Sequence, residues 1–393
     1  MKTQVGIVGA GPAGLFLAHL LGRAGIAAVI LEARSREDVE GTIRAGVLEQ
    51  WVVDLLRELG LAGRLERLAD FHRGISLQWN GQRFHLDMYD LTGGKQVTVY
   101  PQHEVLRDLI AGLLDRGGTL LFEAKVEALE DLTGPTPRLR FRHGGAEEIL
   151  ECDFIVGADG FHGPSRQAIP AALRRELHKT YPFGWLGILT EAPRSWHELI
   201  YANQAGGFAL LSTRTPEIQR LYIQCDPHDD LANWPDERIW AELDSRLALE
   251  GWTLHKGPIF QKGIIPLRSF VCETMHYGRL FLAGDAAHIV PPTGAKGLNL
   301  AVADVKVLAR ALIAHYHEQD DSRLARYDAT CLKRIWKGER FSWYMTTMLH
   351  RNAAETEFER RIHLADLDYV RSSRAAATAL AENYVGLPFE DDA

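Results

Sequence analysis

Three glycines near the start of the chain have the spacing with which a backbone loop binds phosphate groups. Gly9, Gly11 and Gly14 follow an apolar run at residues 5–8 and precede a stretch with helical spacing. The first glycine of such a loop permits a tight turn, the second lets a pyrophosphate approach the backbone, and the third lets helix pack on strand. Glu32 ends the next apolar run, where a carboxylate can accept hydrogen bonds from a ribose. The loop therefore predicts a dinucleotide site at a helix N-terminus, where free N–H groups and the helix dipole favour anions.

Two glycine–aspartate segments further along the chain indicate which dinucleotide binds. Asp159 and Asp285 each follow an apolar run, and an aspartate at a strand end can bind the hydroxyl groups of a polyol. The amides of Gly297, Leu298 and Asn299, at the start of a long predicted helix, can stabilise negative charge on a reduced isoalloxazine ring. These segments favour FAD over NAD as the bound dinucleotide.

The elements that must position these residues alternate between strand and helix, which indicates an α/β fold with a parallel sheet. Buried strands are expected at residues 5–8, 28–31, 97–101, 119–127 and 153–157, and helices at about 15–21, 47–59 and 103–116. From about residue 181 to 266, short alternating runs separated by glycine, proline and polar turns predict an inserted antiparallel sheet. After residue 283 a glycine-rich loop leads into a helix that starts at about Gly297, and helices dominate the chain to residue 380.

Two arginines of the predicted antiparallel sheet are candidates for binding an anion. Because side chains alternate along a strand, Ser212 and Arg214 share one face, and Arg220 and Tyr222 share a face of the next strand. If residues 215–219 form the turn, Arg214 lies opposite Arg220 and Ser212 lies opposite Tyr222. Directly opposed arginines repel each other, so a nearby anion would explain the pair. Two solvated arginines on a polar face are the alternative that this spacing leaves open.

Composition restricts the class of protein and its partners. A chain of 393 residues suffices for two connected domains or for one large α/β domain with an insertion. The net charge of −8, without a basic run, argues against nucleic acid or an anionic membrane surface as the main partner. The four cysteines are scattered and form no CxxC pair, so neither a disulfide framework nor a metal site is expected. With no signal peptide and no apolar run long enough to span a bilayer, we expect a cytoplasmic protein.

Taken together, the glycine loop and the two glycine–aspartate segments resemble the single-component FAD-dependent aromatic hydroxylases, and the likeness covers essentially the whole chain. Four longer strings, at residues 43–50, 181–187, 198–203 and 382–388, resemble the 4-hydroxybenzoate-hydroxylating members of that family. The resemblance implies a Rossmann-like FAD-binding domain with three layers and a mostly parallel sheet, an inserted antiparallel-sheet substrate domain and a helical C-terminal region. The FAD-binding domain is expected at 1–72, 97–180 and 267–349, the substrate-binding sheet at 73–96 and 181–266, and the helical segment at 350–393.

The resemblance also implies which residues bind the substrate, pass its proton and hold the cofactor. Ser212, Arg214 and Tyr222 match the residues that hold a benzoate carboxylate, and Tyr201 and the carbonyl group of Pro292 match those that contact its phenol. Tyr384 matches the residue bonded to that tyrosine, His72 the far end of a proton relay to solvent, and Arg220 a residue that helps to position the flavin. The expected FAD-binding residues are Gly9, Gly11, Gly14, Glu32, Arg44, Gln102, Asp159, Asp285, Gly297, Leu298 and Asn299.

The activity that the resemblance implies is hydroxylation of 4-hydroxybenzoate to 3,4-dihydroxybenzoate. NAD(P)H would reduce the non-covalently bound FAD, and O₂ would then form a flavin C4a-hydroperoxide whose terminal oxygen attacks the ring. Passing the phenol proton through Tyr201 and Tyr384 toward His72 would activate the carbon ortho to the hydroxyl. A hydroxylase of another phenolic acid, such as salicylate, and a non-catalytic dinucleotide-binding protein are the alternatives. A homodimer is the assembly that the family implies.

A short acidic stretch after the second apolar run predicts NADH rather than NADPH as the reductant. The resemblance places the adenosine end of the nicotinamide cofactor here, and many relatives carry arginine at the positions of Ala33 and Thr42. Asp38 and two neighbouring glutamates would repel a 2′-phosphate, since like charges at close range cost on the order of 1 kcal/mol or more. Arg34 and Arg36 act in the opposite direction.

Overall fold

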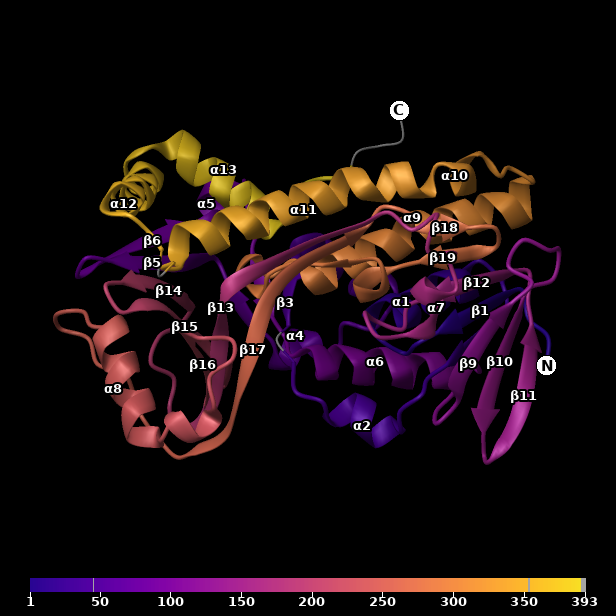
Figure 1. Ribbon diagram of the computed structural model, residues 1–393, viewed down its shortest axis with the longest axis horizontal. Helices are drawn as coiled ribbons and strands as arrows, with labels where there is room; N and C mark the ends of the chain where they lie inside the picture. The colour runs from indigo at the N-terminus through magenta and orange to yellow at the C-terminus, as the bar shows by residue number, and fades with distance from the viewer. Residues whose placement is uncertain (45, 353, 390–393) are drawn as a thin grey trace.

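The computed structural model describes residues 1–44, 46–352 and 354–389, and Figure 1 shows two parts that lie side by side. The part that holds the N-terminus contains a six-stranded sheet that is parallel except for one edge strand. In spatial order its strands are β18 (His276–Tyr277), β19 (Leu280–Leu282), β12 (Phe154–Gly157), β1 (Val5–Val8), β2 (Ala28–Leu31) and β8 (Thr119–Leu121). Because the parallel strands end at one edge, the loops that follow β1, β2, β12 and β19 gather there.

The two faces of this sheet are covered by different layers. Neighbouring residues of a strand point to opposite faces. Gly6 of β1 therefore faces one covering layer, and Ile7 faces the other. A Cβ atom added to Gly6 would lie 2.9 Å from Cδ1 of Leu139, which belongs to a small antiparallel sheet, whereas Ile7 contacts Gly14 on the helical side. The small sheet consists of β9 (Lys125–Glu130), β10 (Arg138–His143) and β11 (Ala146–Glu151). The predicted three-layer fold with a mostly parallel sheet is confirmed.

Helices cover the side of the sheet toward which Ile7 points. α1 contacts β1 and β2 and packs between α6 and α9. The helices of this part are α1 (Pro12–Arg23), α2 (Arg36–Gly41), α3 (Gln50–Glu58), α4 (Leu65–Leu68), α6 (Gln102–Asp115), α7 (Pro164–Gln167), α9 (Gly297–Glu318) and α10 (Ser322–Ala325). A further three-stranded sheet is formed by β3 (Val47–Glu49), β7 (Val97–Val99) and β4 (Asp70–His72).

The second part is built on an eight-stranded sheet whose two faces are both buried. In order its strands are β20 (His288–Ile289), β17 (Ile259–Cys272), β13 (Glu176–Glu191), β16 (Ile218–Cys225), β15 (Gly207–Thr215), β14 (Leu199–Gln204), β5 (Gly74–Trp79) and β6 (Gln82–Asp87). All neighbours are antiparallel except β14 and β5. Ile200 and Leu221 pack with α8 (Asp236–Arg246), whereas Tyr201 and Tyr222 pack with helices from the C-terminal region. Alternation along the strands thus sends the two tyrosines to the face opposite α8.

Two long strands pass from one part to the other. β13 and β17 pair along most of their length, and Figure 1 shows both of them crossing the middle of the molecule. Their register shifts between Thr180 and Gly184. The predicted domain limits at 180/181 and 266/267 lie inside these strands, so the domain boundaries stay a prediction.

Three long helices follow α10 and cover both parts. α11 (Tyr327–Leu349) places Tyr327 in the core of the first part and Met345 in the core of the second. α12 (Glu357–Ser372) begins with a capping box in which Thr356 and Glu359 satisfy each other's backbone amides, and α13 (Arg374–Val385) follows it. The remaining short elements are α5 (Met88–Leu91), η1 (Leu231–Asn233), η2 (Gly284–Ala286) and η3 (Pro292–Gly294). Among the described residues, no helix has the length and apolar character needed to cross a membrane.

Two predicted elements differ from the structure. The helix predicted at 47–59 starts only at Gln50, because residues 47–49 form β3 and pair with β7. The side chain of Asn299 holds them extended, accepting a hydrogen bond from the amide of Glu49 at 2.9 Å and donating one to the carbonyl of Val47 at 2.9 Å. The strand predicted at 119–127 is divided into β8 and β9, since Glu123 adopts a φ of 55° and turns the chain between two sheets.

Candidate active site

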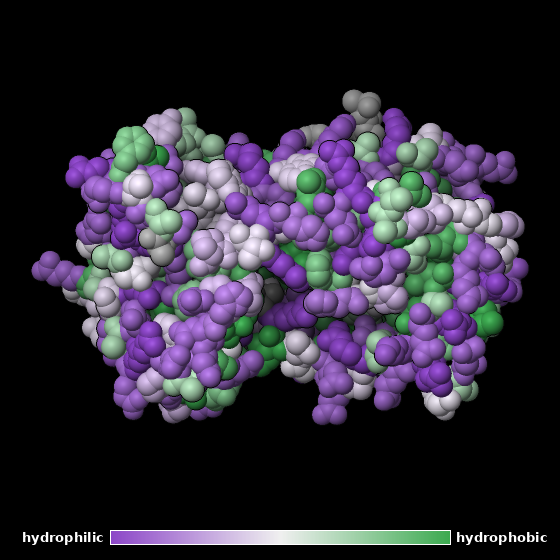
Figure 2. Space-filling view, viewed as in Figure 1, coloured by the Kyte–Doolittle hydropathy of each residue, from purple (hydrophilic) through white to green (hydrophobic). Residues whose placement is uncertain are grey.

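A cavity of about 940 Å³ lies between the two parts. The first part contributes the loops after β1, β2 and β12 and the segment that leads into α9, and the second part contributes β13 to β16. Seen from the side of Figure 1, the surface is hollowed between the two parts (Figure 2). Among the residues predicted to bind FAD, Arg44 and Gln102 also line this cavity. Sequence segments that are far apart along the chain therefore meet at one site.

Close approach of two backbone segments explains the glycine loop. Gly9 has a φ of 103°, and a Cβ atom there would lie 2.4 Å from the carbonyl oxygen of Ala158. A Cβ atom at Gly14 would lie 2.1 Å from the carbonyl oxygen of Gly9, so the helix could not pack there. At Gly11 the nearest atom would be 3.9 Å away, which leaves the space over this residue to the cavity. Because α1 begins at Pro12, unpaired amides of its first turn face the same region.

Two carboxylates flank this loop. Glu32 accepts hydrogen bonds from the amides of Ala10 at 2.7 Å and of Arg34 at 3.0 Å, which hold its buried side chain at the cavity wall. Oδ2 of Asp159 accepts a hydrogen bond from the amide of Ser165 at 2.8 Å, whereas its buried Oδ1 has no partner in the part of the chain that the structure describes. Burial raises the pKa of Asp159. An unsatisfied acceptor at the wall of a cavity fits a ligand that donates a hydrogen bond.

The segment before α9 lines the other side of the cavity. Asp285, Pro292, Gly297 and Leu298 all face it. Asn299 is the one predicted residue of this group whose side chain is used elsewhere, since it ties the start of α9 to β3. Asn299 therefore acts on the helix start indirectly, through the position of the amides before it.

The substrate-facing sheet has a different register from the one expected. Ser212 lies opposite Arg220, because the turn contains only residues 216 and 217. The prediction that residues 215–219 form the turn, with Arg214 opposite Arg220, is therefore wrong. Arg214 lies at a β-bulge, where the pairing shifts between Thr213 and Thr215. A bulge adds an unpaired residue and re-aims its side chain, which here faces the cavity.

The two arginines nevertheless lie close together, both beside Tyr222, and some of their nitrogen atoms lack a hydrogen-bond partner among the described residues. In the described part of the chain, Nε and Nη1 of Arg214 and Nε of Arg220 are buried without a hydrogen bond. Burial lowers the pKa of Arg214, and repulsion by Arg220 acts in the same direction. Gly187 of β13 makes room for them, since a Cβ atom there would lie 3.2 Å from Nη2 of Arg220. Buried cations without a partner are costly, so this arrangement fits an anionic ligand. The alternative of two solvated arginines does not describe these side chains.

Two tyrosines at the same cavity are hydrogen-bonded to each other. The hydroxyl groups of Tyr201 on β14 and Tyr384 on α13 form a hydrogen bond of 2.6 Å, and both side chains are fully enclosed. Burial raises the pKa of both tyrosines, so both hydroxyl groups stay protonated at neutral pH. Tyr201 lines the cavity, and Tyr384 lies behind it. The pair can pass a proton away from a ligand without holding a charge.

Sequence reasoning missed a buried ion pair behind the tyrosines. Nζ of Lys296 donates to Oε1 of Glu49 at 2.5 Å and to the carbonyl oxygen of Tyr384 at 3.0 Å. Burial lowers the pKa of Lys296, and the carboxylate of Glu49 opposes this shift. No pattern in the sequence predicts this ion pair, because its two residues belong to segments that are distant along the chain.

His72 is buried and is not bonded to either tyrosine in the described part of the chain. Its Nε2 lies 3.1 Å from Oδ2 of Asp70, which in turn forms an ion pair of 3.0 Å with Arg194. The side chain of His72 is 0% exposed, whereas that of Asp70 is 25% exposed. The predicted role of His72 at the far end of a relay stays a prediction, and Asp70 is the group that reaches solvent beside it.

The two arginines near the predicted reductant site are already paired with carboxylates. Nε of Arg34 lies 3.1 Å from Glu32, and Nε of Arg36 lies 2.6 Å from Glu40. Thr42 lines the cavity and donates its hydroxyl group to the carbonyl oxygen of residue 38 at 2.5 Å. The positive charge that opposed the predicted NADH preference is thus partly neutralised.

Comparison with known proteins identifies the family. Residues 2–342 match the family described as an FAD binding domain. A p-hydroxybenzoate hydroxylase of Acinetobacter baylyi is 48% identical over 391 residues, which cover 99% of this chain and 96% of that protein. The chain belongs to the FAD-dependent aromatic hydroxylases. It is a flavoprotein monooxygenase, and the FAD that the glycine loop and the two aspartate segments predicted is its cofactor.

The chain is also similar to two more distant proteins. A probable NADH-specific resorcinol 4-hydroxylase of Rhodococcus jostii is 26% identical over 83% of this chain and 62% of that protein. The solved structure of p-nitrophenol 4-monooxygenase from Pseudomonas putida superposes with a TM-score of 0.86 at 20% identity, covering 98% of this chain and 99% of that one. At this identity the second match concerns the fold alone.

The described residues fit FAD. The glycine cradle leaves space over Gly11, Oδ1 of Asp159 lacks a partner, and the first-turn amides of α9 face the cavity. We expect the α1 loop and Glu32 to hold the ADP half, Asp159 and Asp285 the central part, and the amides of Gly297 and Leu298 the ring. Among the described residues no three His, Cys, Asp or Glu side chains are grouped as metal ligands.

Alanine at two positions of the loop separates packing from ligand binding. Gly9→Ala is expected to destabilise the apoprotein by about 1–3 kcal/mol, because it combines a positive φ with a clash against Ala158. Gly11→Ala is expected to leave apoprotein stability within about 0.5 kcal/mol, since no protein atom is near. Its added methyl group should instead weaken FAD binding by at least an order of magnitude, because it occupies the space of the pyrophosphate. Thermal unfolding of the apoproteins and fluorescence titration with FAD measure both effects. Wild-type FAD affinity in Gly11→Ala would contradict the placement.

Proposed function

We propose that the enzyme hydroxylates 4-hydroxybenzoate to 3,4-dihydroxybenzoate, using NADH, O₂ and bound FAD. The separation between the carboxylate clamp and the tyrosine pair is the observation that carries this proposal. Tyr201, Leu210 and Tyr222 lie in one row across β14, β15 and β16. Two strand spacings, roughly 10 Å, therefore separate the backbones of the two tyrosines. A benzene ring with substituents at opposite ends spans such a gap between their side chains.

The clamp orients the substrate. Arg214 presents a guanidinium fork, and a carboxylate can bind it through two parallel hydrogen bonds. Ser212 and Tyr222 lie on the same wall of the cavity and supply further hydroxyl groups. Binding a carboxylate would offset the cost of burying Arg214 and Arg220 without an anion. We propose that Arg220, which is adjacent to the clamp, helps to position the flavin.

The tyrosine pair activates the ring. When bound and reduced, FAD activates dioxygen and supplies the oxygen atom that enters the ring. Tyr201 can accept the phenol proton while its own proton moves to Tyr384 along the 2.6 Å hydrogen bond. Loss of that proton increases electron density at the carbon ortho to the phenol oxygen, where an electrophilic oxygen atom attacks. We propose that the carbonyl of Pro292, at the cavity wall, contacts the same hydroxyl group, and that His72 receives the proton further along.

A panel of hydroxybenzoates tests the proposed substrate. NADH oxidation should increase strongly with 4-hydroxybenzoate and yield 3,4-dihydroxybenzoate, whereas salicylate should give little product. In salicylate the hydroxyl group is next to the carboxylate, so a ring held by Arg214 would leave Tyr201 without a phenol. Efficient turnover of salicylate, with the product identified, would favour the alternative phenolic-acid hydroxylase.

Replacing Tyr201 by phenylalanine tests the proton relay. This change removes one hydroxyl group and is expected to preserve FAD binding and flavin reduction while lowering the rate of hydroxylation by about 100-fold or more, the scale of general acid–base catalysis. Tyr344→Phe, at a partly buried tyrosine outside the cavity, is the matched control. An unchanged rate of hydroxylation in Tyr201→Phe would refute the assignment.

We propose that NADH is preferred over NADPH. Three features support the preference: Arg34 and Arg36 are paired with carboxylates, Thr42 is neutral, and Asp38 adds negative charge. A 2′-phosphate would therefore meet little uncompensated positive charge near α2. The name of the Rhodococcus jostii relative agrees with this reading, since it describes an NADH-specific enzyme.

The ratio of kcat/KM values for the two reductants measures this preference. We expect NADH to be favoured by about 5-fold or more, as repulsion of the 2′-phosphate by on the order of 1 kcal/mol or more implies. The double variant Asp38→Ser/Thr42→Arg should shift the ratio toward NADPH, while Thr42→Val should leave it near the wild-type value. A wild-type preference for NADPH, or no shift in the double variant, would contradict the proposal.

We also propose a homodimer in the cytoplasm. Large apolar side chains are exposed on α11 and α12: Trp336, Trp343, Phe358, Ile362 and Tyr369. Figure 2 shows apolar surface over α12 at the upper left. Large apolar side chains exposed on neighbouring helices are typical of interaction surfaces. All four cysteines are buried free thiols, which suits a reducing compartment. Fractionation of cells that produce the protein would test the compartment.

Charge on this apolar surface tests the dimer. Phe358→Glu/Ile362→Glu is expected to convert dimers to monomers in sedimentation velocity, because a paired copy would have to bury two carboxylates. Ile149→Glu, on the exposed face of β11, is the matched control and should sediment as the wild type does. A monomeric wild type, or an unchanged sedimentation coefficient in the double variant, would refute this interface.

A further inference from the structure

A second cavity, of about 500 Å³, lies among α9, α10, α11 and the segment that follows α13. None of the residues that line it also lines the FAD cavity. The proposed hydroxylation uses no residue of this second cavity. Cavities of this size are typical of sites for small organic ligands.

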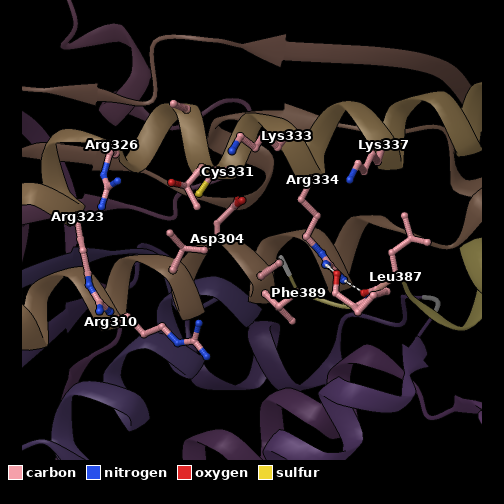
Figure 3. A pocket seen from close by; sticks show the side chains of 15 residues that line it. Asp304, Arg310, Arg323, Arg326, Cys331, Lys333, Arg334, Lys337, Leu387 and Phe389 are labelled. Atoms are coloured by element: carbon pink, nitrogen blue, oxygen red, sulfur yellow. Dashed lines mark hydrogen bonds between the residues drawn. The ribbon is translucent and has the colours of Figure 1, made fainter. Parts of the chain in front are cut away.

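Basic side chains dominate the walls of this cavity. They are Arg310 from α9, Arg323 from α10, Arg326 just after α10, and Lys333, Arg334 and Lys337 from α11. Figure 3 shows the first three at one end of the cavity and the other three along α11. Lys333 and Lys337 are one helical turn apart, so both point to the same side of α11. This gathering of positive charge contrasts with the net charge of −8 of the whole chain.

Part of this charge is compensated, because Arg334 pairs with Glu49 at 3.6 Å. Asp304 is the one carboxylate among the residues that line the cavity, and it is already engaged. Its Oδ2 accepts hydrogen bonds from the amide of Gly284 at 2.9 Å and from Nε2 of His288 at 2.6 Å. Within the described part of the chain, Arg310 and Lys333 form no ion pair. Like charges held near one another repel, and a bound anion would relieve that repulsion.

One wall of the cavity is apolar and is built around an aromatic ring. Val307, Leu387 and Phe389 line this wall. The Phe389 ring packs edge-on against Trp51 with centroids 4.8 Å apart, and the guanidinium carbon of Arg334 lies 4.3 Å from its centroid. Arg334 also donates to the carbonyl oxygen of Leu387 at 2.8 Å, which holds the segment in place. The cavity therefore combines fixed positive charge with a surface for an apolar or planar group.

We propose that this cavity binds a small organic polyanion, with phosphate or carboxylate groups on the arginine and lysine side chains and an apolar body against Val307 and Phe389. Guanidinium groups match the geometry of both kinds of acid, and ammonium groups add charge without a fixed geometry. The proposal is independent of the hydroxylation, so either can fail without the other.

An acidic stretch of the same chain is the competing source of negative charge. Glu390, Asp391 and Asp392 follow Phe389 in the sequence and lie outside the described residues. A variant in which all three are replaced by their amides removes this competition while leaving the cavity unchanged. Titrations of both forms therefore distinguish an absent site from a masked one.

Calorimetric titration of the FAD-loaded enzyme at low ionic strength tests the proposal. Three probes separate the contributions: pyrophosphate carries charge alone, ATP adds a planar base to phosphates, and benzene-1,2,4-tricarboxylate adds a ring to carboxylates. Arg310→Gln/Lys333→Gln removes two cations of the cavity, and Arg67→Gln/Lys95→Gln removes two exposed cations elsewhere as the matched control. Because FAD occupies the glycine loop at residues 9–14 throughout, the probes cannot bind there.

We expect one saturable site for ATP or the tricarboxylate in the wild type or in the neutralised-tail form. The Arg310→Gln/Lys333→Gln change, made in the form that binds, should weaken that binding by about tenfold, as loss of charge-assisted contacts implies. The control should keep its affinity, and added salt should weaken binding because exposed cations are screened. Tighter binding of ATP than of the tricarboxylate would assign phosphate, and the reverse order would assign carboxylate. No saturable binding in either form, or equal affinity in the cavity and control variants, would overturn the proposal.

Discussion

The buried ion pair between Lys296 and Glu49 is the contact on which the geometry of the active site depends. Lys296 precedes α9, Glu49 ends β3, and the same ammonium group donates to the carbonyl oxygen of Tyr384 on α13. Removing ions from water costs several kcal/mol each, so such a pair is stable only when hydrogen bonds complete it. The start of α9 and the backbone of Tyr384 therefore share one buried cation. Moving either one would break a buried hydrogen bond or ion pair of Lys296.

The sheet provides the second constraint, because alternation along its strands decides what faces the cavity. Tyr201 and Tyr222 point toward the C-terminal helices, while Ile200 and Leu221 point toward α8. The bulge at Arg214 and the missing side chain at Gly187 then place two guanidinium groups on the tyrosine side. Tyr201, Ser212, Arg214 and Tyr222 all lie on this one sheet, which fixes their separation. C-terminal helices close the same face and exclude water from it.

Local and distant features of this protein differed in how well they could be read from the sequence. Gly9, Gly11 and Gly14 act within one turn, and their roles follow from short-range sterics. The register between β15 and β16 was predicted wrongly, because it depends on a two-residue turn and a bulge that composition does not reveal. The sequence predicted a helix where β3 is found. The prediction failed because the side chain that holds β3 extended belongs to Asn299, far along the chain.

The sequence by itself determined the kind of protein: the glycine loop, the two aspartate segments and the alternating strands predicted an FAD site in an α/β fold with an inserted sheet, and the family resemblance of these and four longer strings implied a hydroxylase. Their signals are local, because each depends on backbone conformation or on periodicity within a few residues. Only the tertiary structure decided which polar groups meet, and so how each charge is surrounded. The orphaned nitrogens of Arg214, the engaged carboxylate of Glu49 and the basic walls around Arg310 all depend on which distant segments meet. Burial and pairing depend on contacts between distant segments, and no single stretch of sequence contains those contacts.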